Sequence, residues 1–192
     1  MASASGVRVT PIQGKGLGMI ATRAYARGDI VLVERPLVHV LEDIRPGHAG
    51  STHYAGGDRN DALRKLLTLC RSSKGKDDVE RVMKANSFVL QEGEYTRFPV
   101  RWTRVAFLQI SRINHACTPS CYFAWDPSNE TGTIRALRSI APDEELTIQY
   151  GAEGAFRERQ DYLKRSYDFD CRCDKCVYEM KERSEIRGHA TG

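Results

Sequence analysis

The stretch SRINHACTPSCYF, residues 111–123, places an Asn-His pair beside two cysteines in the second half of the chain. Taken alone, Asn114 and His115 are most often part of a satisfied, buried hydrogen-bond network. Cys117 and Cys121 are thiols that can ligate a metal ion together with cysteines from elsewhere in the chain. The stretch therefore supports either a structural network or a chemical site, and the rest of the sequence has to decide between them.

A second cysteine group lies in CRCDKC, residues 171–176. Three thiols at this C-x-C-x2-C spacing, in a segment too short to build a core of its own, indicate a metal site. Because zinc prefers four ligands, a distant thiol has to complete the site, and Cys117 is favoured over Cys121. The alternative is three unligated surface thiols. We expect a closed zinc site that attaches this segment to the body of the protein, with the ligands Cys117, Cys171, Cys173 and Cys176.

The composition is that of an ordinary globular protein. Of the 192 residues, 41% are hydrophobic and 28% are charged, which predicts one compact domain that needs no disulfides. No apolar run reaches about 18 residues, so the sequence predicts no membrane span. Residues 1–18 lack the pattern of a secretion signal or a transit peptide. We expect a soluble, intracellular protein.

The charge balance gives little support to nucleic-acid binding. The chain has 29 Lys and Arg against 25 Asp and Glu, a formal net charge of +4 spread over many charges of both signs. Four basic residues share a predicted helix, and a solvated charged face explains them more simply than a phosphate-binding surface: Arg157, Arg159, Lys164 and Arg165. Three basic residues near the cysteines are expected to offset the charge of a four-thiolate zinc centre: Arg172, Lys175 and Lys164.

The first half of the chain begins with β-structure and continues with helices. A glycine-rich turn separates the strand-like run Val7–Ile12 from a second run that extends to Leu41, and the composition of Glu42–Asp58 predicts a surface loop. Helical spacing of apolar residues then predicts three helices. Their markers are Leu63, Leu66, Leu67 and Cys70 for the first, Val79, Val82 and Met83 for the second, and Trp102, Val105, Ala106 and Gln109 for the third. Cys70 is expected to be buried on the first helix.

The second half returns to β-structure before a charged helix. Alternating residues from Cys121 onward, interrupted by the turn-forming run DPSNETG, predict a hairpin, and Glu145–Tyr150 predicts a further strand. Phe156–Tyr167 has apolar residues at helical spacing and leads into the cysteine segment. The polar tail after Tyr178 is expected to fray.

Two further features are ambiguous by themselves. The glycines of GKGLG, residues 14–18, allow a ligand to approach the backbone closely, but they lack the context of a nucleotide-binding loop, and a β-turn explains them. Tyr150 ends a predicted strand, where a tyrosine is ordinarily a packing residue.

Taken in order along the chain, these motifs resemble those of the SET-domain family of protein lysine methyltransferases. GKGLGMIATRAYARGDIVL resembles the first cofactor-binding strand and turn of that family, SRINHACTPSC its N-H-x-C-x-P-N motif, and EELTIQYG its E-L-x-x-x-Y strand. DFDCRCDKC resembles the zinc-binding post-SET segment, and KANSFVL the T-N-S-F stretch of the SET-and-MYND subgroup. The resemblance spans Val7–Cys176.

The sequence departs from that subgroup in three places. Residues 42–58 contain no cysteine, so the MYND zinc finger is absent, and nothing after Cys176 resembles the helical C-terminal domain. We therefore expect partner and substrate recognition by those parts to be lost. The last Asn of the N-H-x-C-x-P-N motif is Ser120, which shortens one hydrogen-bonding arm.

The resemblance implies an α+β, β-rich SET fold, in which small sheets surround the NHAC segment threaded against the ELTIQY strand in a knot-like arrangement. It implies a SET domain over residues 7–168 with a variable insert at about 42–110, a post-SET zinc segment over 169–178, and a flexible tail over 179–192. In such a fold S-adenosylmethionine lies on one face, and the substrate lysine enters from the opposite face.

The resemblance also assigns the site residues. Tyr150 is similar to the catalytic tyrosine, which orients the lysine amine. The implied cofactor-binding residues are Lys15, Gly16, Leu17, Gly18, Asn86, Asn114, His115, Tyr150, Tyr167 and Phe169. The zinc is implied to be structural and to hold the segment with Tyr167 and Phe169 against the site.

The leading interpretation is thus an S-adenosylmethionine-dependent protein-lysine N-methyltransferase that modifies a histone or another protein. One alternative is a catalytically silent SET module that binds cofactor or peptide, and another is a basic, zinc-dependent nucleic-acid binder. We expect a monomer in the nucleus or the cytoplasm, with one structural zinc ion, a protein or peptide lysine as substrate and no membrane attachment.

Overall fold

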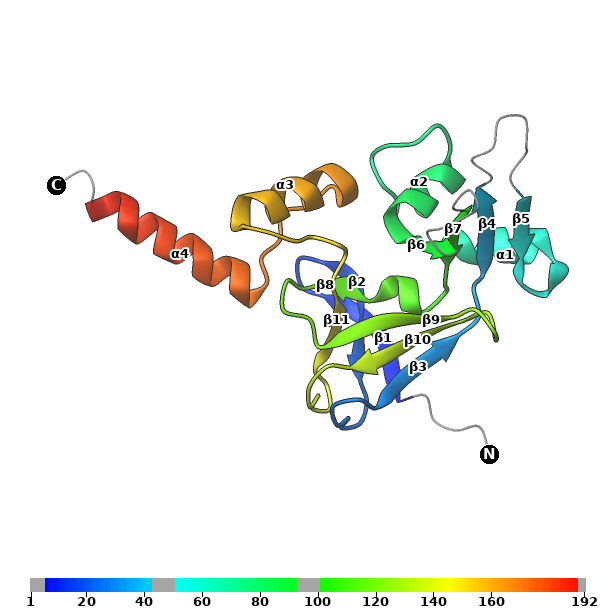
Figure 1. The fold of residues 1–192 in the computed structure, drawn as a ribbon, viewed down its shortest axis with the longest axis horizontal. Coiled ribbons are helices and arrows are strands. Elements are labelled where there is room, and N and C mark those ends of the chain that lie inside the picture. Colours follow the sequence, from blue (N-terminus) through cyan, green and yellow to red (C-terminus); the bar gives the residue numbers. More distant parts are fainter. Residues whose placement is uncertain (1–5, 43–50, 93–100, 190–192) are drawn as a thin grey trace.

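A computed structural model describes residues 6–42, 51–92 and 101–189, which form three small β-sheets and four α-helices (Figure 1). The strands are β1 (Val7–Ile12), β2 (Gly16–Ala21), β3 (Ile30–Glu34), β4 (Val38–Glu42), β5 (Ser51–Tyr54), β6 (Phe88–Glu92), β7 (Arg101–Ala106), β8 (Asn114–His115), β9 (Cys121–Asp126), β10 (Thr131–Ala136) and β11 (Glu145–Ile148). The helices are α1 (Arg59–Leu66), α2 (Asp78–Asn86), α3 (Phe156–Tyr167) and α4 (Asp174–His189), with short 3-10 turns η1 (Ala55–Gly57) and η2 (Ile110–Arg112). The predicted β-rich fold of small sheets is confirmed.

The first sheet joins the N-terminal hairpin to a strand near the other end of the chain. Its strand order is β1-β2-β11-β8, and Met19 of β2 lies opposite Leu146 of β11. The hairpin turn holds Gly14 and Gly16 at φ of 73° and 75°, a region that glycine adopts without strain.

The short strand β8 lies parallel to β11 at the edge of this sheet. Asn114 is opposite Thr147 and His115 is opposite Ile148. The Asn-His pair is thereby placed beside the strand that leads into Tyr150, as the resemblance implied. Parallel pairing requires a long crossover, and here the chain passes through β9 and β10 before it returns as β11.

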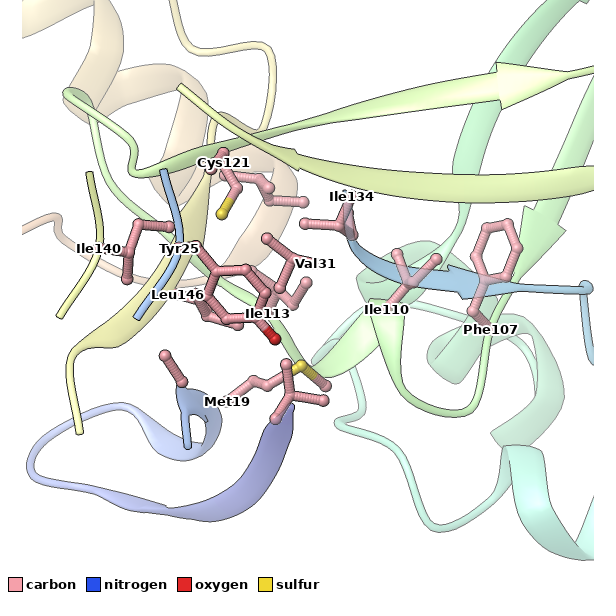
Figure 2. Packing of buried hydrophobic residues seen from close by; sticks show 14 of the residues in the cluster. Met19, Tyr25, Val31, Phe107, Ile110, Ile113, Cys121, Ile134, Ile140 and Leu146 are labelled. Carbon is pink, nitrogen blue, oxygen red and sulfur yellow. The ribbon is translucent and has the colours of Figure 1, made fainter. Parts of the chain in front are cut away.

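The main hydrophobic core contains residues of the first sheet and of the second sheet, whose order is β3-β10-β9. Figure 2 shows Met19, Ile113 and Leu146 packed near Tyr25, while Ile134 and Cys121 enter the same core from the hairpin of β9 and β10. Ile113 and Leu146 are at most 1% exposed. Because these residues flank the motif residues, the core fixes β8 and β11 in place.

The third sheet is formed by β4, which precedes the predicted insert, and by three strands of the insert itself. Its order is β5-β4-β7-β6, and α1 and α2 pack on it around a separate cluster of buried residues (Figure 1). The cluster consists of Leu37, Val38, Ala62, Leu66, Leu69, Val82, Met83 and Ala106. The insert therefore has a small core of its own.

Three predictions for the insert differ from the structure. The third helix predicted around Trp102–Gln109 is wrong, because residues 101–106 form β7, where β-branched Thr103 and Val105 are fully buried in a central strand. The loop predicted over Glu42–Asp58 contains β5 and η1, and residues 43–50 lie outside the described residues. Cys70 is exposed rather than buried, because α1 ends at Leu66.

The C-terminal part consists of α3 and α4, and α4 points away from the sheets (Figure 1). Asp168 ends α3 in the left-handed conformation, with φ of 66°. The helix α4 continues through the predicted boundary at residue 178 to His189, where a flexible tail was expected; residues 190–192 lie outside the described part. Lys, Glu, Arg and Met are good helix formers, which explains the extra turns.

None of the four described α-helices combines the length and the apolar composition needed to cross a membrane.

Candidate functional site

The four cysteines predicted to bind zinc lie together between β8 and the helices α3 and α4. The sulfurs of Cys117, Cys171, Cys173 and Cys176 are all within 4.8 Å of one another. Tetrahedral coordination at a Zn–S distance of about 2.3 Å requires sulfurs about 3.8 Å apart. Cys117 Sγ lies 3.5 Å from Cys176 Sγ and 4.0 Å from Cys171 Sγ, so the four thiols can hold a zinc ion.

The alternative fourth ligand, Cys121, is not part of this group. Its side chain is fully buried in the main core on β9, where burial raises the pKa of its thiol. A raised pKa disfavours the thiolate that metal binding needs. The choice of Cys117 over Cys121 therefore agrees with the arrangement of the sulfurs.

His115 connects the cysteine group to the strand that carries Tyr150. The backbone N–H of Tyr150 donates to His115 Nδ1 at 3.2 Å, so the proton of a neutral ring resides on Nε2. That nitrogen lies 3.3 Å from Cys117 Sγ and can donate to it. Burial lowers the pKa of His115 to about 4, so the ring is neutral near pH 7. His115 thus links the metal ligand to the backbone of Tyr150.

Tyr150 lies in an aromatic cluster at the end of β11. Its ring centroid is 4.8 Å from that of Tyr167 and 5.4 Å from that of His115, and the Phe169 ring lies 6.2 Å from His115. The Tyr150 hydroxyl donates to the backbone oxygen of Ile113 at 2.7 Å. Burial raises the pKa of Tyr150, so its phenol stays neutral. The hydroxyl therefore keeps its lone pairs for an acceptor role and does not act as a phenolate base.

The glycine-rich segment and Asn114 meet at the other end of β8. Asn114 Nδ2 donates to Glu145 Oε1 at 3.0 Å and approaches the backbone oxygen of Leu17 at 3.4 Å. Glu145 Oε2 in turn pairs with Lys15 Nζ at 2.6 Å. Lys15, Leu17 and Asn114 are therefore brought together, with Glu145, which the sequence analysis did not single out, between them.

Gly18 leaves the space that the Asn114 amide occupies. A Cβ atom at Gly18 would lie 2.5 Å from Asn114 Nδ2, which is closer than van der Waals contact allows. We expect Gly18→Ala to displace the amide and to weaken S-adenosylmethionine binding by about tenfold, since a hydrogen bond to a charged group contributes about 1.5–3 kcal/mol. Calorimetric titration measures this effect.

Gly14→Ala is the matched control for Gly18→Ala. Gly14 has a positive φ, which Gly18 does not have, and no atom lies within 4 Å of its Cβ position, so this variant strains the same hairpin without the clash. Equal loss of affinity in the two variants would show that general disturbance of the hairpin, rather than displacement of Asn114, is responsible.

Asn86, a predicted cofactor residue, has a different set of contacts. It ends α2, and its Nδ2 donates to the backbone oxygens of Cys70 at 2.6 Å and Val82 at 2.7 Å. No hydrogen bond among the described residues joins its side chain to the other predicted cofactor residues. Its backbone oxygen accepts from Ser111 Oγ at 2.8 Å, which links the insert to the segment before β8.

Ser120 replaces the last Asn of the motif, and its shorter side chain still forms hydrogen bonds. The backbone N–H of Ser120 donates to Thr147 Oγ1 at 3.0 Å, and the backbone N–H of Thr147 donates to Ser120 Oγ at 2.9 Å. Both residues are buried. This reciprocal pair fastens the segment after β8 to β11.

Asp168, between Tyr167 and Phe169, contacts the insert. Asp168 Oδ2 accepts from the backbone N–H of Ser73 at 2.8 Å and from Ser72 Oγ at 3.0 Å. These hydrogen bonds join the α1–α2 connection to the end of α3. No sequence pattern indicates this contact, because the partners are 95 and 96 residues apart.

We expect the Asp168 contact to depend on pH. The hydrogen bond from Ser73 N–H lowers the pKa of Asp168 below its ordinary value of about 3.9. The contact therefore stabilises the fold above that ordinary pKa and is lost as the pH falls through the lower value of the folded state.

In Asp168→Gly, which keeps the left-handed backbone, we expect faster amide hydrogen exchange at residues 72–74 and a raised KM for the cofactor. Asp168→Asn keeps an acceptor oxygen and should lie between these states; unchanged exchange in Asp168→Gly would contradict the assignment.

A family comparison and a comparison with curated proteins agree in the kind of protein they indicate. The SET domain family pattern matches residues 16–151. The histone-lysine N-methyltransferase set5 of Schizosaccharomyces pombe is 27% identical over 181 residues, which are 93% of this chain and 53% of that protein. The histone-lysine N-methyltransferase SMYD3 of Homo sapiens is 31% identical over 104 residues, which are 54% of this chain and 23% of that protein.

A third relative matches a long part of the chain. The histone-lysine N-methyltransferase Suv4-20 of Caenorhabditis elegans is 27% identical over 147 residues, which are 74% of this chain and 46% of that protein. The chain thus spans about half the length of the set5 and Suv4-20 relatives.

Proposed function

This chain belongs to the SET-domain family, and from that premise we propose that it is an S-adenosylmethionine-dependent protein-lysine N-methyltransferase. The observation that carries the proposal is the parallel pair of β8 and β11, which brings Asn114, His115 and Tyr150 to one place. The relatives that carry the name histone-lysine N-methyltransferase support a protein substrate.

The residues present fit the cofactor that the family implies. S-adenosylmethionine supplies, when bound, a methyl group on a positively charged sulfur. Lys15, Leu17, Gly18 and Asn114 would hold it through the close approach at Gly18 and the polar atoms beside it. Tyr167 and Phe169 would cover it from the end of α3, where they already contact Tyr150 and His115.

We propose that Tyr150 orients the substrate amine. A lysine has an ordinary pKa of about 10.4, and an apolar, aromatic environment favours the neutral amine that can attack a methyl group. Because the phenol of Tyr150 stays neutral and donates to Ile113, its oxygen is fixed in position and can accept from the amine. Catalysis then rests on alignment and exclusion of water.

We propose the domain division that the resemblance implies. A SET domain over residues 7–168 would contain the insert at about 42–110, and residues 169–178 would form the post-SET zinc segment. We propose residence in the nucleus or cytoplasm and a monomeric state, with a histone or another protein as substrate.

The first experiment is calorimetric titration of the zinc-replete protein with S-adenosylmethionine. We expect one-to-one binding that weakens by about tenfold or more in Asn114→Ala. Asn129→Ala is the control, because Asn129 lies in the exposed hairpin turn, bound to Asp126. Absence of binding by a folded, zinc-loaded protein would contradict the proposed cofactor.

Methyl release from labelled cofactor separates the enzyme from a silent module. We expect transfer to a lysine of a histone or another protein in a cell extract. Cofactor binding without transfer to any of these substrates would favour a cofactor- or peptide-binding module. Steep loss of nucleic-acid affinity with salt would be needed to support the nucleic-acid binder.

A further inference from the structure

One buried cation contacts the cysteine group. Arg159, on α3, has a side chain that is only 4% exposed. Its Nη1 donates to the backbone oxygen of Gly154 at 2.8 Å, and its Nη2 lies 3.8 Å from Cys176 Sγ. Nη2 also donates to the Glu179 carboxylate on α4. The predicted solvated face of α3 is therefore wrong at Arg159, which points inward.

The charge of the metal site explains why a cation is buried here. Four thiolates around one Zn²⁺ carry a formal charge of about −2, and an uncompensated charge is costly to bury. Lys164, which the sequence analysis expected to offset this charge, pairs instead with Asp170 at 2.9 Å, with more than half of each side chain exposed. Arg172, another expected cation, is exposed. Lys175, the third expected cation, is half-buried. In the described part of the chain, Arg159 is the buried cation that donates a hydrogen bond to a sulfur of the group.

An arginine guanidinium suits this position better than a lysine ammonium would. Its planar group carries five N–H donors and is weakly hydrated, so it can serve several acceptors in fixed directions. At Arg159 these acceptors belong to three segments: the loop before α3 at Gly154, the ligand Cys176, and α4 at Glu179. One side chain therefore connects both helices to the thiolate group.

We propose that Arg159 is a positioning residue of the zinc centre, which retains the metal by donating to the Cys176 thiolate. Glu179 orients the guanidinium from α4 and thereby ties that helix to the centre. This inference rests on the zinc site assigned to the four cysteines. Hydrogen bonds to metal ligands from such outer residues typically change metal affinity by about 10–100-fold.

Zinc release to a coloured chelator, 4-(2-pyridylazo)resorcinol, tests the proposal without any activity assay. We expect Arg159→Met, similar in length but uncharged, to release zinc at least about tenfold faster than the unmodified protein. Lys164→Met removes a cation from the same helix at a position that faces Asp170, and its release rate should stay unchanged. If both variants released zinc equally fast, loss of any positive charge on α3 would explain the effect, and the specific contact of Arg159 with Cys176 would be overturned.

Cobalt substitution provides a signature that loss of structure alone does not produce. Arg159→Lys keeps the positive charge but loses the fixed donor, so it serves if Arg159→Met fails to fold. When the N–H donor leaves Cys176, the thiolate donates more strongly to the metal, and we expect the sulfur-to-Co²⁺ charge-transfer band to move to lower energy. An unmoved band together with unmoved zinc release would overturn the role of Arg159.

The zinc content of the unmodified protein distinguishes failure of the role proposed for Arg159 from failure of the metal site itself. One zinc per chain in the unmodified protein, with no effect of the Arg159 variants, overturns the role of Arg159 only. Absence of zinc in the folded, unmodified protein overturns the metal site and this inference together. Glu179→Gln completes the set: we expect faster hydrogen exchange in α4, because the tie from that helix to Arg159 is weakened.

Discussion

Tyr150→Phe is expected to lower kcat by about 10²–10³-fold, the effect of removing one positioned hydrogen-bonding group from an active site. The hydroxyl is fixed by its 2.7 Å hydrogen bond to Ile113, and the neighbouring Tyr167 ring holds the Tyr150 ring. The variant keeps the ring and therefore the aromatic contacts. Cofactor affinity should stay within a few-fold, because the loss is confined to the step in which the amine is oriented.

Steady-state kinetics and calorimetry of the same preparation test this separation. Loss of the hydroxyl also leaves the Ile113 carbonyl without its partner, which should cost about 1–3 kcal/mol of stability. Denaturant unfolding measures that cost, so rates can be corrected for the folded fraction. Tyr162→Phe removes a hydroxyl from the same aromatic cluster without touching Ile113 and is the control. Full activity in Tyr150→Phe would remove the tyrosine from the mechanism.

The second large effect on activity is expected when zinc is removed. Chelation is expected to abolish methyl transfer, a loss of at least about 100-fold, while the three sheets stay folded. The apparent free energy of zinc binding in small zinc sites, about 10–16 kcal/mol, is also folding free energy of the segment that binds it. In this protein that segment is the cluster around the cysteines, which includes Tyr167 and Phe169, whereas the main core contains none of the four ligands.

Hydrogen exchange and circular dichroism locate the change. We expect loss of protection in α3 and α4 with retained protection in β10, and recovery on return of Zn²⁺ but not of Mg²⁺, which prefers oxygen ligands. Cys173→Ser should reproduce the effect, and Cys70→Ser, an exposed thiol outside the cluster, should not. Retained turnover in the metal-free, folded protein would show that zinc does not hold the site.

The sequence predicted best those features that are local or carried by a motif. The hairpin of β1 and β2 followed from apolar runs and glycines, and the grouping of the four cysteines followed from thiol spacing together with the Asn-His segment. The third helix was mispredicted because Trp102, Val105 and Ala106 match a helical spacing, whereas pairing with β4 and β6 decides the conformation. Local periodicity does not contain that pairing.

The contacts that the sequence did not reveal are those made across long distances by ordinary charged residues. Arg159 belongs to a run of basic residues on α3, and nothing in that run separates the buried arginine from its exposed neighbours. Glu34 is similar: its carboxylate accepts from the backbone N–H groups of Leu108, Gln109 and Ile110, and so holds the turn before β8. Such residues are recognised only once the backbone has brought their partners together.

The pairing of Met19 with Leu146 has a consequence for how the chain is made. During synthesis the ribosome releases β2 long before β11, so the N-terminal hairpin lacks its neighbour until more than a hundred further residues have emerged. Contacts between residues so distant in sequence also slow folding, because loop closure comes before any gain in energy. Cys176 is likewise synthesised well after Cys117, so we expect metal capture to be a late event that slows the separation of residues 171–176 from the segment after β8.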